Sequence, residues 1–556
     1  MFVTRNGVQM KFARMVLAAI VLIACDDKAA RERPDAAPPP EPLQLVDVAN
    51  RARSHLDGKP AHALYPSQDS TPLWVDAGGK PNKGAREAIA ALLVAAGEGL
   101  DSAAYGAGDL RRRADSLAAI RHPGAEVVAG FDADLSRSVL QYLTDLHNGR
   151  VDPRSLGLKL TIPKDEHEVA AMVRTGLAKS GIEQVVKDLR PPLALYRRLR
   201  TALSQYRELA VRHPDWPALA PVTKGIKPGM QYPDMAVVAD RLRILGDLEG
   251  RANPPTDSAV YAPELADAIK RFQDRHGLGA DGVIGKGTLA ALNVPPAARA
   301  RQIALSLERL RWLPDLDGRR FIVVNIPSYH LWAWDSSGGE GTPSIDMDVI
   351  VGKRAVDTRT PVFVDDMTYL IFRPYWNVPV SIASSEIVPA AMKDHTYLAR
   401  EDMEIVKGQS DASPVVEYSK GNLEKVAKGE LRVRQRPGER NALGLVKFIF
   451  PNDANVYLHG TPAQSLFSRA SRDFSHGCVR VEQPVDLAAW VLRDVEGWDQ
   501  GRILAAMEDN RSKRVDLATP VRVVLFYTTA LARMDGQVEF AEDIYGHDAP
   551  LLAAMK

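Results

Sequence analysis

The spacing of apolar residues divides the chain into a helical first half and a second half that is rich in short strands. In the first half apolar residues recur at intervals of three and four, the period of an amphipathic helix, within 88–96, 135–146 and 193–209. Glycine and proline residues separate these runs, and polar residues are dispersed without any cluster that indicates chemistry. We therefore predict a helical domain with a structural role over 45–228.

A smaller unit follows. Val238, Leu242 and Leu245 share one helix face, and Gly246 is placed to cap that helix. Further short helical runs are separated by glycines, which permit tight turns. The pattern predicts a compact three-helix unit over 229–296, with Phe272 and Leu292 in its core, and then a connecting helix over 297–318.

After residue 320 the period changes to that of strands. Short β-branched and aromatic runs, bounded by turn residues, lie at 321–326, 331–334, 347–351, 369–372, 444–450 and 456–458. The tail segments 521–528 and 536–540 predict a final hairpin that closes the sheet. We predict a mostly-β domain over 319–556, so that the whole chain is a multidomain α+β protein. A charged, irregular insertion at about 385–441 is expected to cover a site as a lid.

The N-terminus has the order of a secretory signal, in which basic residues precede an apolar run at 15–24. That run ends in Leu22-Ile23-Ala24-Cys25, which resembles a bacterial lipobox, where the cysteine is lipidated. We expect a signal peptide over 1–25 and a proline-rich tether over 26–44. The alternative is a plain signal peptide with an incidental cysteine. Asp26-Asp27 resembles an inner-membrane retention signal, so we expect a lipoprotein in the periplasm of a gram-negative bacterium, anchored in the inner rather than the outer membrane.

Charge and cysteine content narrow the function. The net charge is +1, so no basic excess favours a nucleic-acid partner. The chain has two cysteines, Cys25 and Cys478, and a disulfide between them is possible in an oxidising compartment. If Cys25 carries a lipid, Cys478 is the only thiol of the mature protein.

Candidate catalytic groups gather late in the strand-rich region. His459-Gly460 follows one strand, and Ser475-His476-Gly477-Cys478-Val479-Arg480 follows soon after, before a helix that starts at Pro484. We expect Cys478 to lie in a loop between a strand and a helix, where backbone N–H groups point at a reacting oxygen. Since only the thiolate attacks efficiently, an imidazole must take the proton, and both His459 and His476 are available.

These motifs resemble the catalytic signature of the L,D-transpeptidase family with its YkuD-type domain, in its large multidomain gram-negative branch. The unit over 229–296 resembles the peptidoglycan-binding module, and the region before it the helical scaffold domain of the same branch. The resemblance implies that Cys478 is the nucleophile and His459 the general base, oriented by the carbonyl of Gly460. The resemblance also implies that His476 and Arg480 shape the site, that Arg480 and Ser475 contact the substrate, and that the N–H groups of Gly477 and Cys478 stabilise the oxyanion. We expect Tyr457 and Trp376 to line the substrate, with packing in the core as the equal alternative. A glycine after His459 departs from the family, in which aspartate is at least as frequent.

The resemblance also implies the reaction. The donor is a tetrapeptide stem of peptidoglycan, whose third-residue carbonyl forms a thioester with release of D-alanine. The diaminopimelate amine of a second stem then resolves the thioester into a 3–3 cross-link, and carbapenems acylate the cysteine. No cofactor or metal is expected, and the absence of an HEXXH sequence argues against a zinc hydrolase. Three alternatives stay open: an L,D-carboxypeptidase, a transferase that attaches a lipoprotein to peptidoglycan, and an inert wall-binding scaffold.

Overall fold

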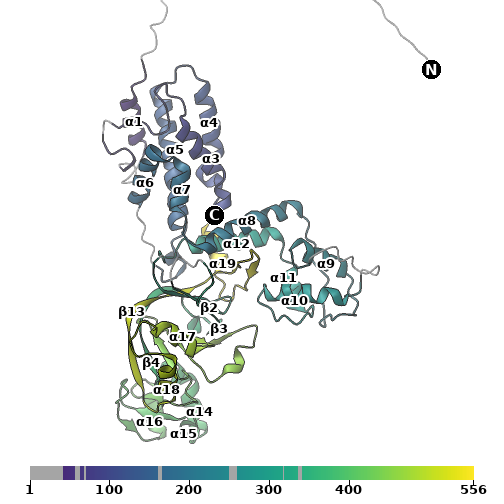
Figure 1. The fold of residues 1–556 in the computed structure, drawn as a ribbon, viewed down its shortest axis with the longest axis vertical. Coiled ribbons are helices and arrows are strands. Elements are labelled where there is room, and N and C mark those ends of the chain that lie inside the picture. Colours follow the sequence, from purple (N-terminus) through teal and green to yellow (C-terminus); the bar gives the residue numbers. More distant parts are fainter. Residues whose placement is uncertain are drawn as a thin grey trace, which may run out of the picture. The chain divides into compact units, whose positions relative to one another are not determined.

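The computed structural model describes residues 42–556, apart from 57–62, 68–69, 161–165, 249–258, 317 and 336–340. The expected signal peptide, Cys25 and most of the tether lie outside the described residues. The described chain has the predicted organisation, with a helical region, a small helical unit and a mostly-β domain (Figure 1). None of its described helices is both long enough and apolar enough to cross a membrane.

The helical region is organised around one long helix, α5 (Ala125–Asn148). Its apolar residues recur every three or four positions and are buried against neighbours on several sides. The helices that contact it are α1 (Leu45–Ser54), α3 (Lys83–Leu93), α4 (Ala107–Ala119), α6 (Glu166–Lys179) and α7 (Ile182–Leu189). Short 3-10 turns lie at Ala95–Glu98, Ser102–Tyr105 and Pro153–Leu156. This region therefore has a core of its own.

Two further helices lie against the β domain. The helices α8 (Ala194–Arg212) and α12 (Pro296–Leu310) contact each other, and their apolar faces form one cluster with Phe321 and Val524 of the sheet. The predicted connecting helix is α12, which begins at a proline, a residue well suited to a first helical turn.

The three-helix unit contains α9 (Met235–Ile244), α10 (Ala266–Asp274) and α11 (Lys286–Leu292), with a 3-10 turn at Pro263–Leu265. Gly246 follows α9 with φ +84°, the left-handed conformation of a glycine cap, as predicted. Phe272 and Leu292 are fully buried in its core, which confirms their assignment from the sequence.

A nine-stranded sheet forms the centre of the β domain, in the order β11-β3-β12-β10-β9-β4-β13-β1-β2. An additional pairing between β2 and β3 brings the ends together into a barrel-like arrangement. Its strands are β1 (Phe321–Asn325), β2 (His330–Trp334), β3 (Ile345–Gly352), β4 (Phe363–Phe372), β9 (Val446–Ile449), β10 (Leu458–His459), β11 (Asp473–Ser475), β12 (Val479–Val481) and β13 (Lys513–Phe526).

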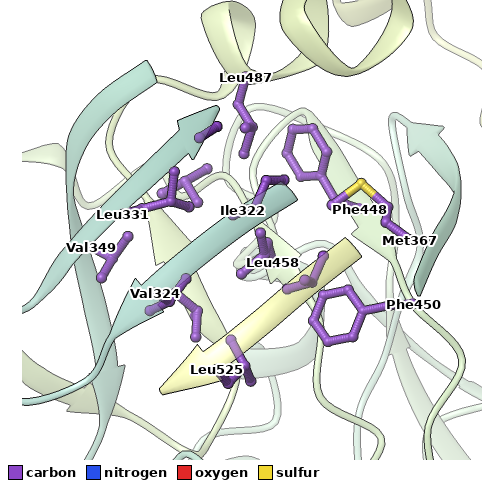
Figure 2. Packing of buried hydrophobic residues seen from close by; sticks show 14 of the residues in the cluster. Ile322, Val324, Leu331, Val349, Met367, Phe448, Phe450, Leu458, Leu487 and Leu525 are labelled. Carbon is purple, nitrogen blue, oxygen red and sulfur yellow. The ribbon is translucent and has the colours of Figure 1, made fainter. Parts of the chain in front are cut away.

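Alternate residues of these strands fill the interior of the sheet. Figure 2 shows side chains from separate strands, among them Val349, Phe448 and Leu458, meeting in one apolar cluster. Successive side chains of a strand point to opposite faces, so the neighbours of these core residues lie on the outer face. The helices α17 (Pro484–Leu492) and α18 (Gln500–Glu508) contribute to the same core, whereas the 3-10 turns Val356–Thr358 and Gln464–Leu466 lie in loops.

The tail differs from the prediction of a closing hairpin. The strand β13 is a central strand, parallel to β1 and antiparallel to β4. The strand β15 (Val538–Phe540) pairs with β14 (Ala530–Ala532) in a separate two-stranded sheet, and α19 (Asp548–Ala554) follows. A period of two identifies a strand but not its partner, and for this reason the pairing was wrong.

The charge of the insertion predicted an irregular segment, but the insertion is folded. It contains a four-stranded sheet, in the order β5-β8-β6-β7, and four short helices around a separate apolar core. The strands are β5 (Trp376–Asn377), β6 (Met403–Val406), β7 (Val415–Val416) and β8 (Arg432–Gln435). The helices are α13 (Val380–Ile382), α14 (Val388–Lys393), α15 (Tyr397–Arg400) and α16 (Lys420–Ala427), with a π-helical turn at Ala383–Ile387. Its elements are two to eight residues long, too short for a clear hydrophobic period.

Candidate active site

Cys478 lies in the bend between two strands, β11 and β12, and not between a strand and a helix as expected. Val479 and Val481 are buried in the sheet, and the Val479 N–H donates to the carbonyl of Tyr457 over 3.1 Å. The chain is therefore back in the sheet directly after Cys478, and α17 begins only at Pro484. The bend is consequently anchored at both ends by strand pairing.

A hydrogen-bond network supports this bend. Gly477 has φ +116°, a conformation that other residues rarely adopt, and a Cβ there would meet the carbonyl oxygen of Arg359 at 3.4 Å. The hydroxyl of buried Thr360 donates to the Gly477 carbonyl over 2.8 Å and accepts from the Gly352 N–H over 2.9 Å. The Tyr545 hydroxyl, from the tail, donates to the Gly352 carbonyl over 2.6 Å. Residues far apart in the sequence thus hold the bend.

Ser475 closes the same bend from within. Its Oγ accepts from the Gly477 N–H over 3.1 Å and donates to the Cys478 carbonyl. The Gly477 N–H is therefore already used, although the sequence had indicated it as an oxyanion donor. Among the hydrogen bonds of the described residues none uses the N–H of Cys478, so of the two expected donors this one is available to a ligand.

Cys478 and His459 project from the same face of two adjacent parallel strands. In the register of β10 and β12, Leu458 lies opposite Val479 and His459 opposite Arg480. Leu458 and Val479 point into the core. The residues on either side of them, Tyr457 and His459 on one strand and Cys478 and Arg480 on the other, therefore share the outer face. His459 and Cys478 are diagonal neighbours there.

The imidazole of His459 is held in one orientation. Its Nδ1 lies 2.5 Å from the carbonyl oxygen of Gly460, and because a carbonyl only accepts, Nδ1 must carry the proton and Nε2 is left as the acceptor. Gly444, with φ +64°, fixes that peptide, since a Cβ on Gly444 would meet the Gly460 carbonyl carbon at 2.6 Å.

Burial and the positive charges near His459 favour its neutral ring. Burial lowers the pKa of His459 to about 3, with help from the positive charges of Arg480 and Lys447 and against the hydrogen bonds to the carbonyls of Gly460 and Leu443. Neutral imidazole is the form that accepts a proton, so at neutral pH this ring can act as a base.

The thiol of Cys478 is partly exposed and rests protonated. Burial raises the pKa of Cys478, while hydrogen bonds from the backbone and side chain of Tyr457 and the charges of Lys447 and Arg480 oppose the rise. Its Sγ lies 3.9 Å from the carbonyl oxygen of Asn455. The resting site therefore holds a neutral thiol and a neutral imidazole, so proton transfer must accompany attack.

His476 makes its contacts with the insertion. Its Nε2 lies 2.7 Å from Oε1 of Glu386, in the π-helical turn, and 3.4 Å from Nζ of Lys353. This contact joins the residue two positions before Cys478 to the folded insertion.

The remaining predicted residues have different surroundings. Tyr457 lies beside the site, with its ring 5.7 Å from that of His459 and with Nζ of Lys447 3.7 Å from its centroid. Trp376, in β5, packs against the core of the insertion, the alternative to substrate lining that its sequence position left open. Arg480 is partly buried, and its Nε has no hydrogen-bond partner. No group of three or more metal-ligating side chains occurs in the part of the chain that the structure describes.

Three family models match the chain. Residues 319–523 match "L,D-transpeptidase catalytic domain", residues 231–292 "Putative peptidoglycan binding domain" and residues 59–203 "Scaffold domain". The first match contains the bend and both strands of the site. The chain carries an L,D-transpeptidase catalytic domain of the YkuD type.

A curated relative and two solved structures are similar to the chain. The relative is a "Putative L,D-transpeptidase" of Haemophilus influenzae, 32% identical over 249 residues, which are 45% of this chain and 48% of the relative. The chain thus matches about half the length of this relative. The structures are L,D-transpeptidases of Xylanimonas cellulosilytica (14% identity, 55% of this chain, 100% of that chain, TM-score 0.17) and Stackebrandtia nassauensis (16%, 55%, 97%, 0.22).

Within the L,D-transpeptidase domain, sequence reasoning gave no role to three residues that contact the site. Thr360 reaches the bend through its hydrogen bond to the Gly477 carbonyl, and strand pairing places Lys447 opposite His459. Glu386 lies in the insertion, where nothing in the local sequence indicates a contact with His476.

Proposed function

We propose that the protein is an L,D-transpeptidase that forms 3–3 cross-links in peptidoglycan through a thioester on Cys478. The observation that supports this most strongly is the shared face of β10 and β12, on which His459, oriented by the Gly460 carbonyl, lies diagonally beside the thiol. A thiol, an oriented neutral base and a free N–H are the parts that acyl transfer needs.

The chemistry follows from these groups. Nε2 of His459 takes the thiol proton as Sγ of Cys478 attacks the third-residue carbonyl of a tetrapeptide stem, and the N–H of Cys478 stabilises the oxyanion. The C–N bond to the terminal D-alanine breaks, and its amine takes the proton from His459. A side-chain amine of a second stem then attacks the thioester, forms the new amide and returns a proton through His459 to the thiol.

The module matched at 231–292 supports a peptidoglycan substrate, because a wall-binding unit holds the domain near an immobile polymer. The proposal includes a periplasmic location and a lipid on Cys25, which lies outside the described residues. Mass analysis of the N-terminal peptide from cells expressing the chain, compared with a Cys25→Ala variant, tests the anchor, since lipidation adds an acyl mass that the variant lacks.

Product analysis tests the function. Purified protein and a Cys478→Ala variant are incubated with disaccharide-tetrapeptides, and the products are identified by mass spectrometry. We expect cross-linked dimers and free D-alanine from the wild type and neither from the variant. Tripeptide without dimers would replace cross-linking by carboxypeptidase activity, and unreacted substrate with an intact thiol would contradict enzymatic activity altogether. A carbapenem should add its mass to the wild type alone.

A further inference from the structure

Three basic side chains stand in one row across the site. In the pairing of β9 with β10, Lys447 lies opposite His459, and in the pairing of β10 with β12, His459 lies opposite Arg480. Figure 2 shows Phe448 and Leu458, the neighbours of the first two, in the core. Lys447, His459 and Arg480 therefore project from the opposite face, about 5 Å apart from strand to strand.

The two cations of this row flank His459 and act on the thiol of Cys478. Tyr457 lies under the Lys447 ammonium, 3.7 Å from Nζ to the ring centroid, and Tyr457 also contributes hydrogen bonds to Cys478. The positive charges of Lys447 and Arg480 both act to lower the pKa of Cys478. An anion held between them would therefore lie over His459, on the face from which Cys478 also projects.

Neither cation has an anionic partner among the described residues. Three other arginines of the domain, buried or half-buried, do have one: Arg434 pairs with Glu404 at 2.6 Å, Arg472 with Asp348 at 2.7 Å and Arg522 with Asp366 at 2.6 Å. No ion pair involves Lys447 or Arg480 in the described chain, and Nε of Arg480 is buried without a hydrogen-bond partner. Asp411 of the insertion acts on Lys447 electrostatically but forms no ion pair with it.

Unpaired charges are costly in such surroundings. Burial lowers the pKa of both Lys447 and Arg480, which means that the protein environment disfavours their charged forms. Buried charges are ordinarily paired, and where a site leaves two of the same sign unpaired beside a nucleophile, a ligand of opposite charge supplies the missing partner.

We propose that Lys447 and Arg480 bind a carboxylate of the donor stem next to the scissile amide, and that Lys447 is thereby a specificity residue of the reaction. The inference rests on the proposed function, because a tetrapeptide stem supplies the anion. Two carboxylates have this chemistry: that of the terminal D-alanine and the side-chain carboxylate of the third residue.

Three donors separate these sources: the free disaccharide-tetrapeptide, one with the terminal carboxylate amidated and one with the side-chain carboxylate amidated. Each is given to the full-length wild type, Lys447→Met and Lys447→Arg, and kcat and KM are obtained from release of the terminal residue. Loss of one charged hydrogen bond should lower kcat/KM roughly 10- to 100-fold. We expect this loss in the wild type with one of the two amides, which identifies the carboxylate that is bound.

Lys447→Met should lose activity with the free donor and show a smaller further loss with that amide than the wild type does, because only Arg480 is left to pair with the carboxylate. Lys447→Arg should retain most of the activity. Lys513→Met is the matched control, since Nζ of Lys513 also lies over a ring of this domain, 4.9 Å from the centroid of Trp498, but is exposed. Its kinetics should stay those of the wild type.

Equal turnover of all three donors by the wild type would overturn the carboxylate site while leaving the proposed function intact. The carboxylate site would also be overturned if amidation lowered kcat/KM of Lys447→Met as much as it lowers kcat/KM of the wild type. That result would indicate that the ammonium acts on the thiol instead. Circular dichroism shows whether Lys447→Met is folded, and calorimetric binding of the free and amidated donors to Cys478→Ala gives a readout without turnover. Failure of the wild type to release D-alanine would contradict the proposed function itself.

Discussion

At the scale of single residues, the site is built from groups kept neutral at rest between two cations. Burial lowers the pKa of His459 to about 3 and raises that of Cys478, so neither group carries a charge near neutral pH. A preformed thiolate–imidazolium pair would need the opposite shifts. The positive charges of Lys447 and Arg480, on either side of His459, stabilise the thiolate of Cys478 as it forms during proton transfer.

The thiol titration follows from this arrangement. Burial raises the pKa of Cys478, which predicts that the thiol stays protonated at pH 7 and ionises at a higher pH than an ordinary cysteine thiol. Thiolate absorbance at 240 nm, taken as the difference between the wild type and Cys478→Ser, measures it and removes any contribution from Cys25. A thiolate signal between pH 5 and 7 would show that the pair is ionic instead.

At the scale of elements, the nucleophile bend depends on supports from distant parts of the chain. Thr360 joins the Gly477 carbonyl to the Gly352 N–H, and Tyr545 binds the Gly352 carbonyl. None of these residues reacts, but together they fix the backbone on which the thiol stands.

Thr360→Val tests that support. The substitution keeps the shape of the side chain but leaves a buried carbonyl and a buried N–H without partners, at a cost of about 1–3 kcal/mol. We expect a lower free energy of unfolding of the catalytic domain, together with a lower kcat. Thr358→Val is the control, because the Thr358 hydroxyl is more exposed and lies in a 3-10 turn, and its effect should stay within about 0.5 kcal/mol. Equal effects of the two variants in chemical denaturation would remove the role given to Thr360.

Local patterns predicted the elements well but not their partners. The period of two identified the strand around Val521–Phe526, yet nothing in it shows that β13 lies between β1 and β4 rather than in a hairpin with β15. The motif around Cys478 was recognisable from its residues alone. The contacts of Lys447 and Glu386 depend on strand register and on the folded insertion, which no local sequence feature encodes.

At the scale of the whole molecule, separate cores support separate roles. The helical region, the three-helix unit, the sheet and the insertion each have their own apolar cluster. The three-helix unit also contains a buried ion pair, in which Nε of Arg275 donates to Oδ1 of Asp247 over 2.6 Å, with both side chains at most 3% exposed.

Breaking that pair should destabilise the unit that contains it. Asp247→Ala leaves the Arg275 guanidinium buried without its carboxylate, which costs about 3–5 kcal/mol. Hydrogen exchange of peptides from 231–292 measures the loss locally, where a single unfolding transition of a multidomain chain would not. Asp267→Ala, which removes an exposed pair with Lys270, should change exchange little. Unchanged protection in Asp247→Ala would show that the pair contributes nothing to the unit.

The central claim, that Cys478 carries the acyl group, is tested most directly by trapping that species. The wild type is mixed with the tetrapeptide donor and quenched in acid within seconds, and the digested protein is analysed by mass spectrometry. We expect a tripeptide-bearing thioester on the peptide that contains Cys478, with one D-alanine released for each adduct, and no adduct in Cys478→Ala. Release of D-alanine by Cys478→Ala at the wild-type rate, or an adduct on another residue, would contradict it.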